Sequence, residues 1–155
     1  MKEHHYTAKL TWSGGSQGPV RDYAGYSREY VVEIPGKAPL AGTADPMFRG
    51  DATLHNPEDL LLAALAGCHM LTYLALCARA RIEVVAYQDD ASGTMALTGG
   101  GGHFTQVTLR PRVSVAPGSD MTKARALHTA AHGDCFIANS VNFPVRNEPE
   151  VVEAT

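Results

Sequence analysis

Two of the three cysteines lie in segments that favour thiol chemistry. Cys68 falls inside the most helix-favouring stretch of the chain, Asn56 to Arg79, among apolar neighbours that by themselves suggest an ordinary core residue. Cys135 follows Asp134, which can cap a new helix, and the free N–H groups of a helix start stabilise a thiolate. From local position alone, Cys68 should have a raised pKa and Cys135 a lowered one.

Two such thiols suit the reduction of a peroxide. A thiolate attacks one oxygen, a cation or donor stabilises the leaving alkoxide, and a second thiol captures the sulfenic acid before it is oxidised further. Cys68 and Cys135 would supply the two sulfur atoms. Cys77 lies nine residues beyond Cys68, on the opposite side of a helix, and is expected only to pack.

The segment around Cys68 resembles the osmotically inducible protein C and organic hydroperoxide resistance (OsmC/Ohr) superfamily. The resemblance rests on the run NPEDLLLAALAGC, with Glu58 directly after Asn-Pro and Cys68 ten residues later, and on a second cysteine 67 positions further on. It extends over nearly the whole chain, from Tyr6 to Val152. The resemblance implies an α+β fold in which two subunits share intertwined sheets around a central pair of helices.

The same resemblance implies a thiol peroxidase that reduces organic hydroperoxides without a cofactor. In that scheme Cys68 is the peroxidatic cysteine and Cys135 the resolving one. The expected partners are the hydroperoxide, a dithiol reductant of the lipoyl type and a second copy of the chain.

The family scheme also places a cation beside Cys68 to keep its thiol ionised. Arg49 is favoured, because it lies on the loop before the helix, nine residues upstream of Glu58. Arg21 and Arg28 are the alternatives, since another branch of the family places its arginine nearer the N-terminus. Glu58 would hold the arginine through a bidentate ion pair, although without the resemblance it is only an acidic residue at the positive end of the helix dipole.

Two other functions are compatible with these residues. His128, His132 and Cys135 form an H-x3-H-x2-C pattern that Cys68 and His69 could complete as a metal site, although no paired C-x-x-C is present. On an alanine-rich helix, His128 and His132 are instead expected to face solvent. The other function is binding of a small apolar ligand without peroxidase activity. His69 also replaces a bulky apolar residue of the family, so a more polar substrate pocket is expected.

Composition fits a single cytosolic domain spanning residues 1–155. The net charge is −3, from 13 basic and 16 acidic residues without a basic cluster, so neither nucleic acid nor a membrane surface is expected as a partner. The N-terminus lacks an apolar signal-peptide core, and the longest uninterrupted apolar run, Leu60 to Cys68, is too short to span a bilayer. In the cytosol, three cysteines are expected as thiols rather than as a disulfide framework.

The elements expected around these residues follow an α+β order with segregated strands and helices. Asn56 is a good N-cap and Pro57 suits the first helical position, so a helix is predicted from Asn56 to Arg79. A second helix should run from Ser119 or Asp120 to about His132, and a short third one should begin at Cys135. Strands are predicted at residues 5–12, 27–34, 37–44, 82–97 and 104–116, with a turn at 99–102 and a weak strand near the C-terminus.

The central helix calls for a partner subunit. Residues 60–66 are apolar on every side, and a chain of this size cannot enclose a long helix alone. Glu58 and Cys68 are separated by about 15 Å along the helix axis and about 80° around it, beyond the reach of one glutamate side chain. Either Arg49 bridges them or the acid near Cys68 comes from the other chain. We therefore predict an obligate homodimer whose sites contain residues of both chains.

Overall fold

The computed structural model describes residues 1–155, and the chain divides into two units, residues 1–60 and 61–155. The N-terminal unit is built on an antiparallel three-stranded sheet in chain order. All three strands predicted before the central helix are present, each shorter than the alternation of residues suggested. The elements are β1 (Lys9–Trp12), η1 (Ser13–Gln17), β2 (Tyr30–Glu33), β3 (Leu40–Gly42) and η2 (Pro46–Phe48).

The predicted central helix is present as α1 (Pro57–Arg79). Its start is capped as the sequence indicated: the side-chain oxygen of Asn56 accepts from the Asp59 N–H at 2.8 Å, and the Asp59 carboxylate accepts from the Asn56 N–H at 3.3 Å. This reciprocal cap satisfies donors that a helix start leaves free. By length and composition α1 could cross a membrane, with 23 residues and a mean hydropathy of 2.0, but the core helix of a soluble protein meets the same description.

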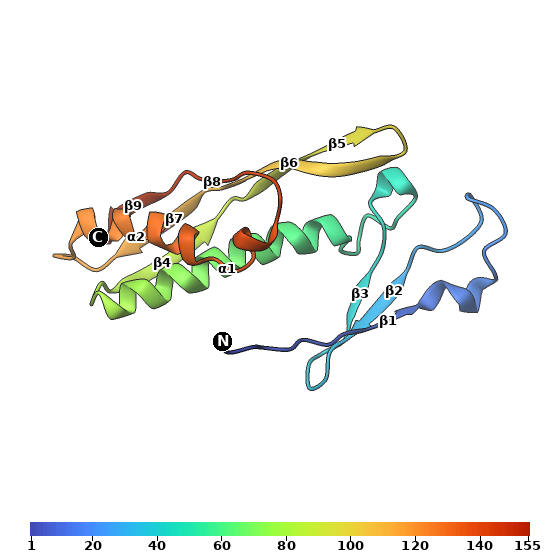
Figure 1. Cartoon of the computed structure of the whole chain (residues 1–155), viewed down its shortest axis with the longest axis horizontal. Helices are drawn as coiled ribbons and strands as arrows, with labels where there is room; N and C mark the ends of the chain where they lie inside the picture. The colour runs from blue at the N-terminus through green and yellow to red at the C-terminus, as the bar shows by residue number, and fades with distance from the viewer. The chain divides into compact units, whose positions relative to one another are not determined.

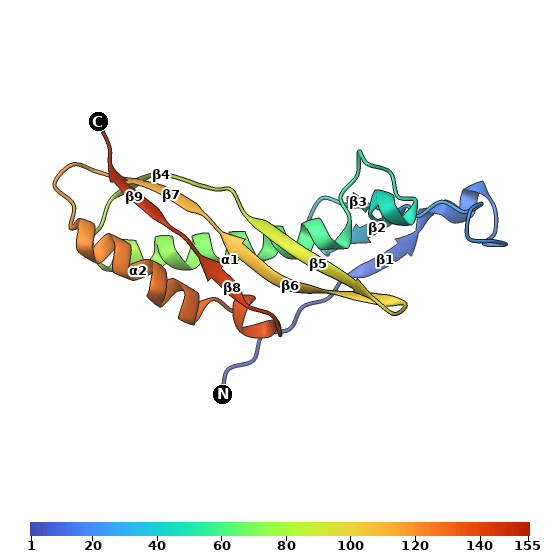
Figure 2. The same cartoon turned by 90° about the horizontal axis from the view of Figure 1, so that it is seen from above.

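The C-terminal unit packs α1 and a second helix against two three-stranded sheets (Figure 1). One sheet has the order β4-β7-β9 and the other β5-β6-β8, with β8 and β9 added in parallel to antiparallel pairs (Figure 2). Gly99 and Gly100, with φ angles of 51° and 99°, form the turn between β5 and β6. The elements are β4 (Val84–Asp89), β5 (Ser92–Thr98), β6 (Gly101–Leu109), β7 (Pro111–Val115), α2 (Met121–Asp134), η3 (Ala138–Ser140), β8 (Val145–Asn147) and β9 (Glu150–Glu153).

Two apolar clusters form the core of this unit. The first joins α1 and α2 to the strands of the β4-β7-β9 sheet, through residues such as Tyr73, Leu127 and Val113. The second packs Leu65, from the first half of α1, against Val107 on β6. Cys77 belongs to the first cluster, and its role in packing is confirmed.

The end of α2 differs from the prediction. Asp120 caps α2 as expected, accepting from the Lys123 N–H at 2.9 Å. The helix then continues to Asp134, so that Cys135 is its C-cap, with its N–H donating to His132 O at 3.3 Å. The third helix predicted to begin at Cys135 is wrong, because only the single 3₁₀ turn η3 follows.

Candidate functional site

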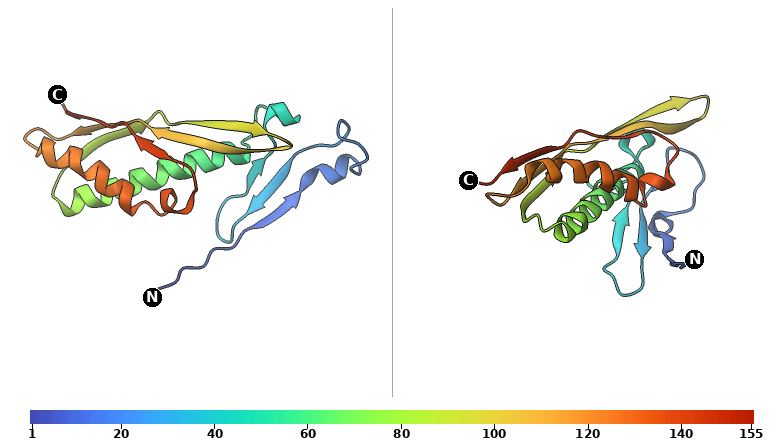
Figure 3. Two further views of the ribbon diagram at one scale, coloured as in Figure 1. Left: turned by 45° about the horizontal axis from the view of Figure 1, so that its top comes forward. Right: turned by 60° about the vertical axis from the view of Figure 1, so that its left-hand side comes forward.

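The structure brings Cys68 and Cys135 together. Cys68 is half-buried on α1, and Cys135 is 1% exposed where α2 ends. The two residues meet because α1 and α2 lie side by side under the same strands (Figure 3). All three cysteines are free thiols, and the Cys135 thiol donates toward the sulfur of Cys68.

The two thiols have opposite pKa shifts. Burial raises the pKa of the Cys68 thiol, but donors around its sulfur lower it by more, so the pKa lies below its ordinary value. Burial raises the pKa of Cys135, and its hydrogen bond to Cys68 raises it further. The donors around Cys68 are the Ile137 N–H, the Cys135 thiol, the Phe136 N–H and the Thr72 hydroxyl.

The order expected from local position is therefore wrong: the pKa of Cys68 is lowered and that of Cys135 is raised, so Cys68 is the more acidic thiol. A helix end presents carbonyl groups rather than free N–H groups, so the C-cap position cannot acidify Cys135. The N–H groups of Phe136 and Ile137, which follow α2, donate to the sulfur of Cys68. Backbone donors thus lower the pKa of Cys68, whereas an arginine was expected from the sequence to have this effect.

Hydrogen bonds hold the turn after α2 in place. The Asn139 N–H donates to Cys135 O at 3.0 Å, and the Ser140 hydroxyl donates to Phe136 O at 2.7 Å. The Ala138 N–H donates to the sulfur of Cys135 at 3.4 Å. One turn therefore positions both sulfur atoms, and it could not be predicted from residue types because its donors are backbone groups.

A groove of about 880 Å³ opens beside Cys68. Its walls are α1 and the residues that follow α2, and they include Leu71, Leu76 and Phe136. Leu71 is 65% exposed and Phe136 79% exposed, so the groove presents apolar side chains to solvent, and the charged residues Arg79 and Asp134 also line it. His69 is buried and does not line the groove, so it adds no polarity to this surface.

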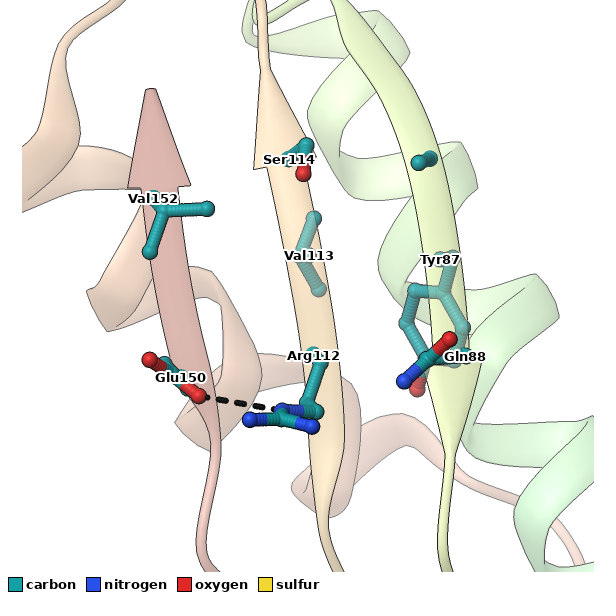
Figure 4. A pocket seen from close by; sticks show the side chains of 8 residues that line it. Tyr87, Gln88, Arg112, Val113, Ser114, Glu150 and Val152 are labelled. Atoms are coloured by element: carbon teal, nitrogen blue, oxygen red, sulfur yellow. Dashed lines mark hydrogen bonds and ion pairs between the residues drawn. The ribbon is translucent and has the colours of Figure 1, made fainter. Parts of the chain in front are cut away.

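A second hollow, of about 340 Å³, lies on the β4-β7-β9 sheet (Figure 4). An ion pair between Arg112 and Glu150, 3.1 Å long, crosses its floor next to Val152. Neither Cys68 nor Cys135 lines this hollow. The groove beside Cys68 is therefore the candidate substrate site.

The candidate arginines and Glu58 belong to the N-terminal unit. Arg28 and Arg49 line one hollow of about 250 Å³, whereas Arg21 is exposed elsewhere in that unit. Arg28 stacks on the ring of Tyr26 at 3.7 Å, and its guanidinium donates to Tyr26 O at 2.5 Å. Arg49 is exposed and takes a left-handed conformation, with φ 68°, where η2 ends.

The expected ion pair between Arg49 and Glu58 is not formed. Glu58 lies on the first turn of α1, close enough to Tyr30 that its charge adds to the effect of burial in raising the pKa of that phenol. Burial is the larger cause. The guanidinium of Arg49 is thus without a carboxylate partner within the chain.

The metal pattern is not assembled either. His69 Nε2 and His128 Nδ1 lie 3.1 Å apart and share a hydrogen bond, and both residues are buried, at 1% and 2% exposure. His132 pairs with the side-chain amide of Asn147 at 3.1 Å. No three His, Cys, Asp or Glu residues gather in a way that could hold a metal ion. The expectation that His128 faces solvent is wrong.

The sequence did carry one signal for this histidine pair. The fully buried residues of α1 recur every fourth position, and His69 falls among them: Leu65, His69, Tyr73 and Cys77. A polar residue on that stripe needs a buried partner.

Comparisons with known proteins agree with this architecture. The family model described as OsmC-like protein matches residues 50–150. The uncharacterized protein YmaD of Bacillus subtilis is 25% identical over 155 residues, covering 97% of this chain and 95% of that protein.

Solved structures show the same fold. An OsmC-like protein of unknown function from Vibrio cholerae is 29% identical, with a TM-score of 0.81 and coverage of 97% of this chain and 100% of that one. An organic hydroperoxide resistance protein from Elizabethkingia anophelis is 20% identical, with a TM-score of 0.67 and coverage of 99% and 100%. At that identity the second likeness shows the fold alone.

Proposed function

Because the chain belongs to the OsmC-like protein family, whose members are soluble proteins, we propose that it is a cytoplasmic thiol peroxidase that reduces organic hydroperoxides. The observation that carries the proposal is the contact between Cys68, whose pKa is lowered, and Cys135, whose pKa is raised, beside a groove with exposed apolar side chains. A thiolate with a neighbouring thiol is what the two-step reduction of a peroxide requires.

The reaction proceeds in three steps. The Cys68 thiolate attacks the terminal oxygen of the hydroperoxide, the O–O bond breaks, and the alkoxide leaves as the alcohol after taking up a proton. The Cys135 sulfur then displaces water from the Cys68 sulfenic acid and forms a disulfide. A dithiol of the lipoyl type, oxidised in turn to its own disulfide, returns both cysteines to thiols.

Arg49 is the proposed cation for the leaving alkoxide, with Arg28 as the alternative. Arg49 has no carboxylate partner, whereas Arg28 is engaged with two tyrosines and their carbonyl groups. Both line the same hollow, together with Glu29 and Asp51. Glu58 is proposed to orient the arginine once the subunits assemble.

Stoichiometric cumene hydroperoxide should convert Cys68 and Cys135 into a disulfide, which mass spectrometry of the unreduced protein detects. Hydrogen peroxide should do so more slowly, because it gains nothing from the groove, where apolar burial contributes about 25 cal/mol per Å². Cys77→Ser serves as the control and should give the same disulfide, since Cys77 lies in the core. A protein that forms no disulfide with either oxidant is not a peroxidase of this kind.

A homodimer is part of the proposal. Leu71 and Phe136 leave large apolar side chains exposed along the groove, and only 22% of the most apolar part of α1 is buried within the chain. Exposed apolar surface of this kind marks an interface. A second copy of α1 would cover it and leave the substrate channel between the two subunits.

Leu71→Glu should convert the dimer into a monomer in light scattering coupled to gel filtration, because a carboxylate cannot be buried unpaired at a helix interface. Val85→Glu is the matched control. Val85 is 58% exposed on β4 of the same unit but lies outside the groove, so this variant should stay dimeric. A Leu71→Glu protein that remains dimeric would place the interface elsewhere.

A further inference from the structure

Two buried polar contacts join the helix that carries Cys68 to the helix that ends at Cys135. Tyr73 on α1 donates its hydroxyl proton to Ala124 O on α2 at 3.0 Å. One turn closer to the thiols, His69 on α1 shares its hydrogen bond with His128 on α2. Apolar residues of both helices pack in the same cluster as Tyr73.

The two contacts form a ladder. On α1, His69 lies four residues before Tyr73. On α2, its partner His128 lies four residues after Ala124, the partner of Tyr73. This is the spacing of two antiparallel helices, and the two helices run in opposite directions (Figure 2). A slip by one turn, about 5.4 Å, would break both rungs at once. The ladder therefore fixes the axial register of the two helices.

The thiols lie at the end of this ladder. Cys68 directly precedes His69 on α1. Cys135 is the C-cap of α2, at the end of the last turns of the helix, which begin at His128. A shift of α2 along its axis would carry Cys135 and the N–H groups of Phe136 and Ile137 together with His128. The register of the helices thus decides whether those donors reach the Cys68 sulfur.

The buried contact between His69 and His128 is unfavourable for the stability of the fold. His69 Nδ1 and His128 Nε2 are buried without a hydrogen-bond partner. Burying polar groups without hydrogen-bond partners destabilises the fold, and an apolar pair of the same shape would avoid that cost. What the histidines add is geometry, because a hydrogen bond has a preferred distance and direction and an apolar contact does not.

The histidines also bring no charge to the thiols at neutral pH. Burial, with a smaller effect of His132 on His69 and of His69 on His128, lowers the pKa of both residues to about 4. The ring of His128 is held from the other side by Tyr73, whose ring stacks on it at 3.8 Å. The pair therefore acts by position and not as an imidazolium partner for a thiolate.

We propose that His69 and His128 are positioning residues, whose hydrogen bond holds Cys135 and its following turn against Cys68 and thereby sets both the acidity of Cys68 and the reduction potential of the Cys68–Cys135 pair. The inference rests on the proposed redox role of this pair. It concerns an interaction between residues 59 positions apart.

The test compares two amides at one position. His128→Asn places an amide where Nδ1 of the imidazole stood, so it can keep the hydrogen bond to His69. His128→Gln carries the same amide one methylene further out and loses that geometry. In a Cys77→Ser background, the pKa of Cys68 is measured from the pH dependence of its alkylation, and the reduction potential is measured in dithiol–disulfide buffers.

We expect His128→Gln to raise the pKa of Cys68 by about one unit, which is about a tenfold fall in its alkylation rate below that pKa, and to change the reduction potential. His128→Asn should remain close to the parent protein in both measurements. Leu127→Ala controls for general damage, since it opens the same core on α2 without touching the rung. At matched stability it should leave the pKa of Cys68 unchanged.

Two results would overturn the inference. One is an equal shift in Leu127→Ala and His128→Gln at the same stability, which would make the pair merely structural. The other is a Cys68 pKa that stays unchanged in a folded His128→Gln protein. Neither measurement uses a hydroperoxide, so a protein without peroxidase activity would refute the proposed function and leave this test valid.

Discussion

Replacing Cys68 with serine should abolish hydroperoxide consumption, whereas replacing Cys135 with serine should leave a single turnover for each subunit. The pKa of Cys68 is lowered and that of Cys135 is raised, so Cys68 is the more readily ionised thiol and the expected nucleophile. Without Cys135 the Cys68 sulfenic acid has no neighbouring thiol and is oxidised onward to the sulfinic acid. Peroxide assays with limiting enzyme give the number of turnovers, and mass spectrometry identifies the oxidised form.

The first turnover of Cys135→Ser should also be slower than that of the parent protein. The Cys135 thiol is one of the donors that lower the pKa of Cys68, and a serine hydroxyl at that position is shorter. Cys77→Ser, which alters a buried core thiol, is the control and should retain full turnover. Complete loss of the first turnover in Cys135→Ser, with the protein folded, would reverse the roles assigned to the two cysteines.

Acidification from about pH 6.5 to about pH 4 should destabilise the protein steeply. His69 and His128 have folded-state pKa values of about 4, because they are buried, against about 6.5 when unfolded. Between these values the unfolded chain binds more protons than the folded one, so stability falls as the pH falls and levels off below pH 4. Each histidine contributes about 3 kcal/mol to this loss, a large share of the roughly 5–15 kcal/mol that stabilises a typical domain.

Urea unfolding followed by far-ultraviolet circular dichroism at a series of pH values measures the effect. The double variant His69→Gln, His128→Asn keeps a hydrogen bond between two groups that do not titrate, and its stability should be nearly flat over this range. If the double variant loses stability with the same slope as the parent, the protons are taken up by other groups.

The fold could be predicted to the extent that local signals determine it. Asn56 and Pro57 started α1 where the sequence placed it, and the glycines at 99 and 100 formed the expected turn. Asp134 misled the prediction, because an aspartate before an apolar run is also compatible with the last turn of a helix. The helix α2 continues through Gly133, beyond the predicted end near His132, since the packing of Ala131 and Leu127 in the core outweighs one weak helix former.

The thiol pair was predictable from the resemblance, but its electrostatics were not. The acidity of Cys68 comes from the N–H groups of Phe136 and Ile137, and backbone donors leave no trace in residue types. The contact between His69 and His128 depends on how two helices pack. Only the four-residue spacing of the stripe on α1 hinted that His69 faces inward.

Because the apolar face of α1 is open, the stability of the folded chain depends on its concentration. In the proposed dimer, folding and association are linked, so each tenfold rise in subunit concentration favours the assembled state by about 1.4 kcal/mol for each dimer. Dilution has the opposite effect and returns Leu71 and Phe136 to water. A cell that raises production of this protein therefore also makes every existing copy harder to unfold, without any change in sequence or ligand.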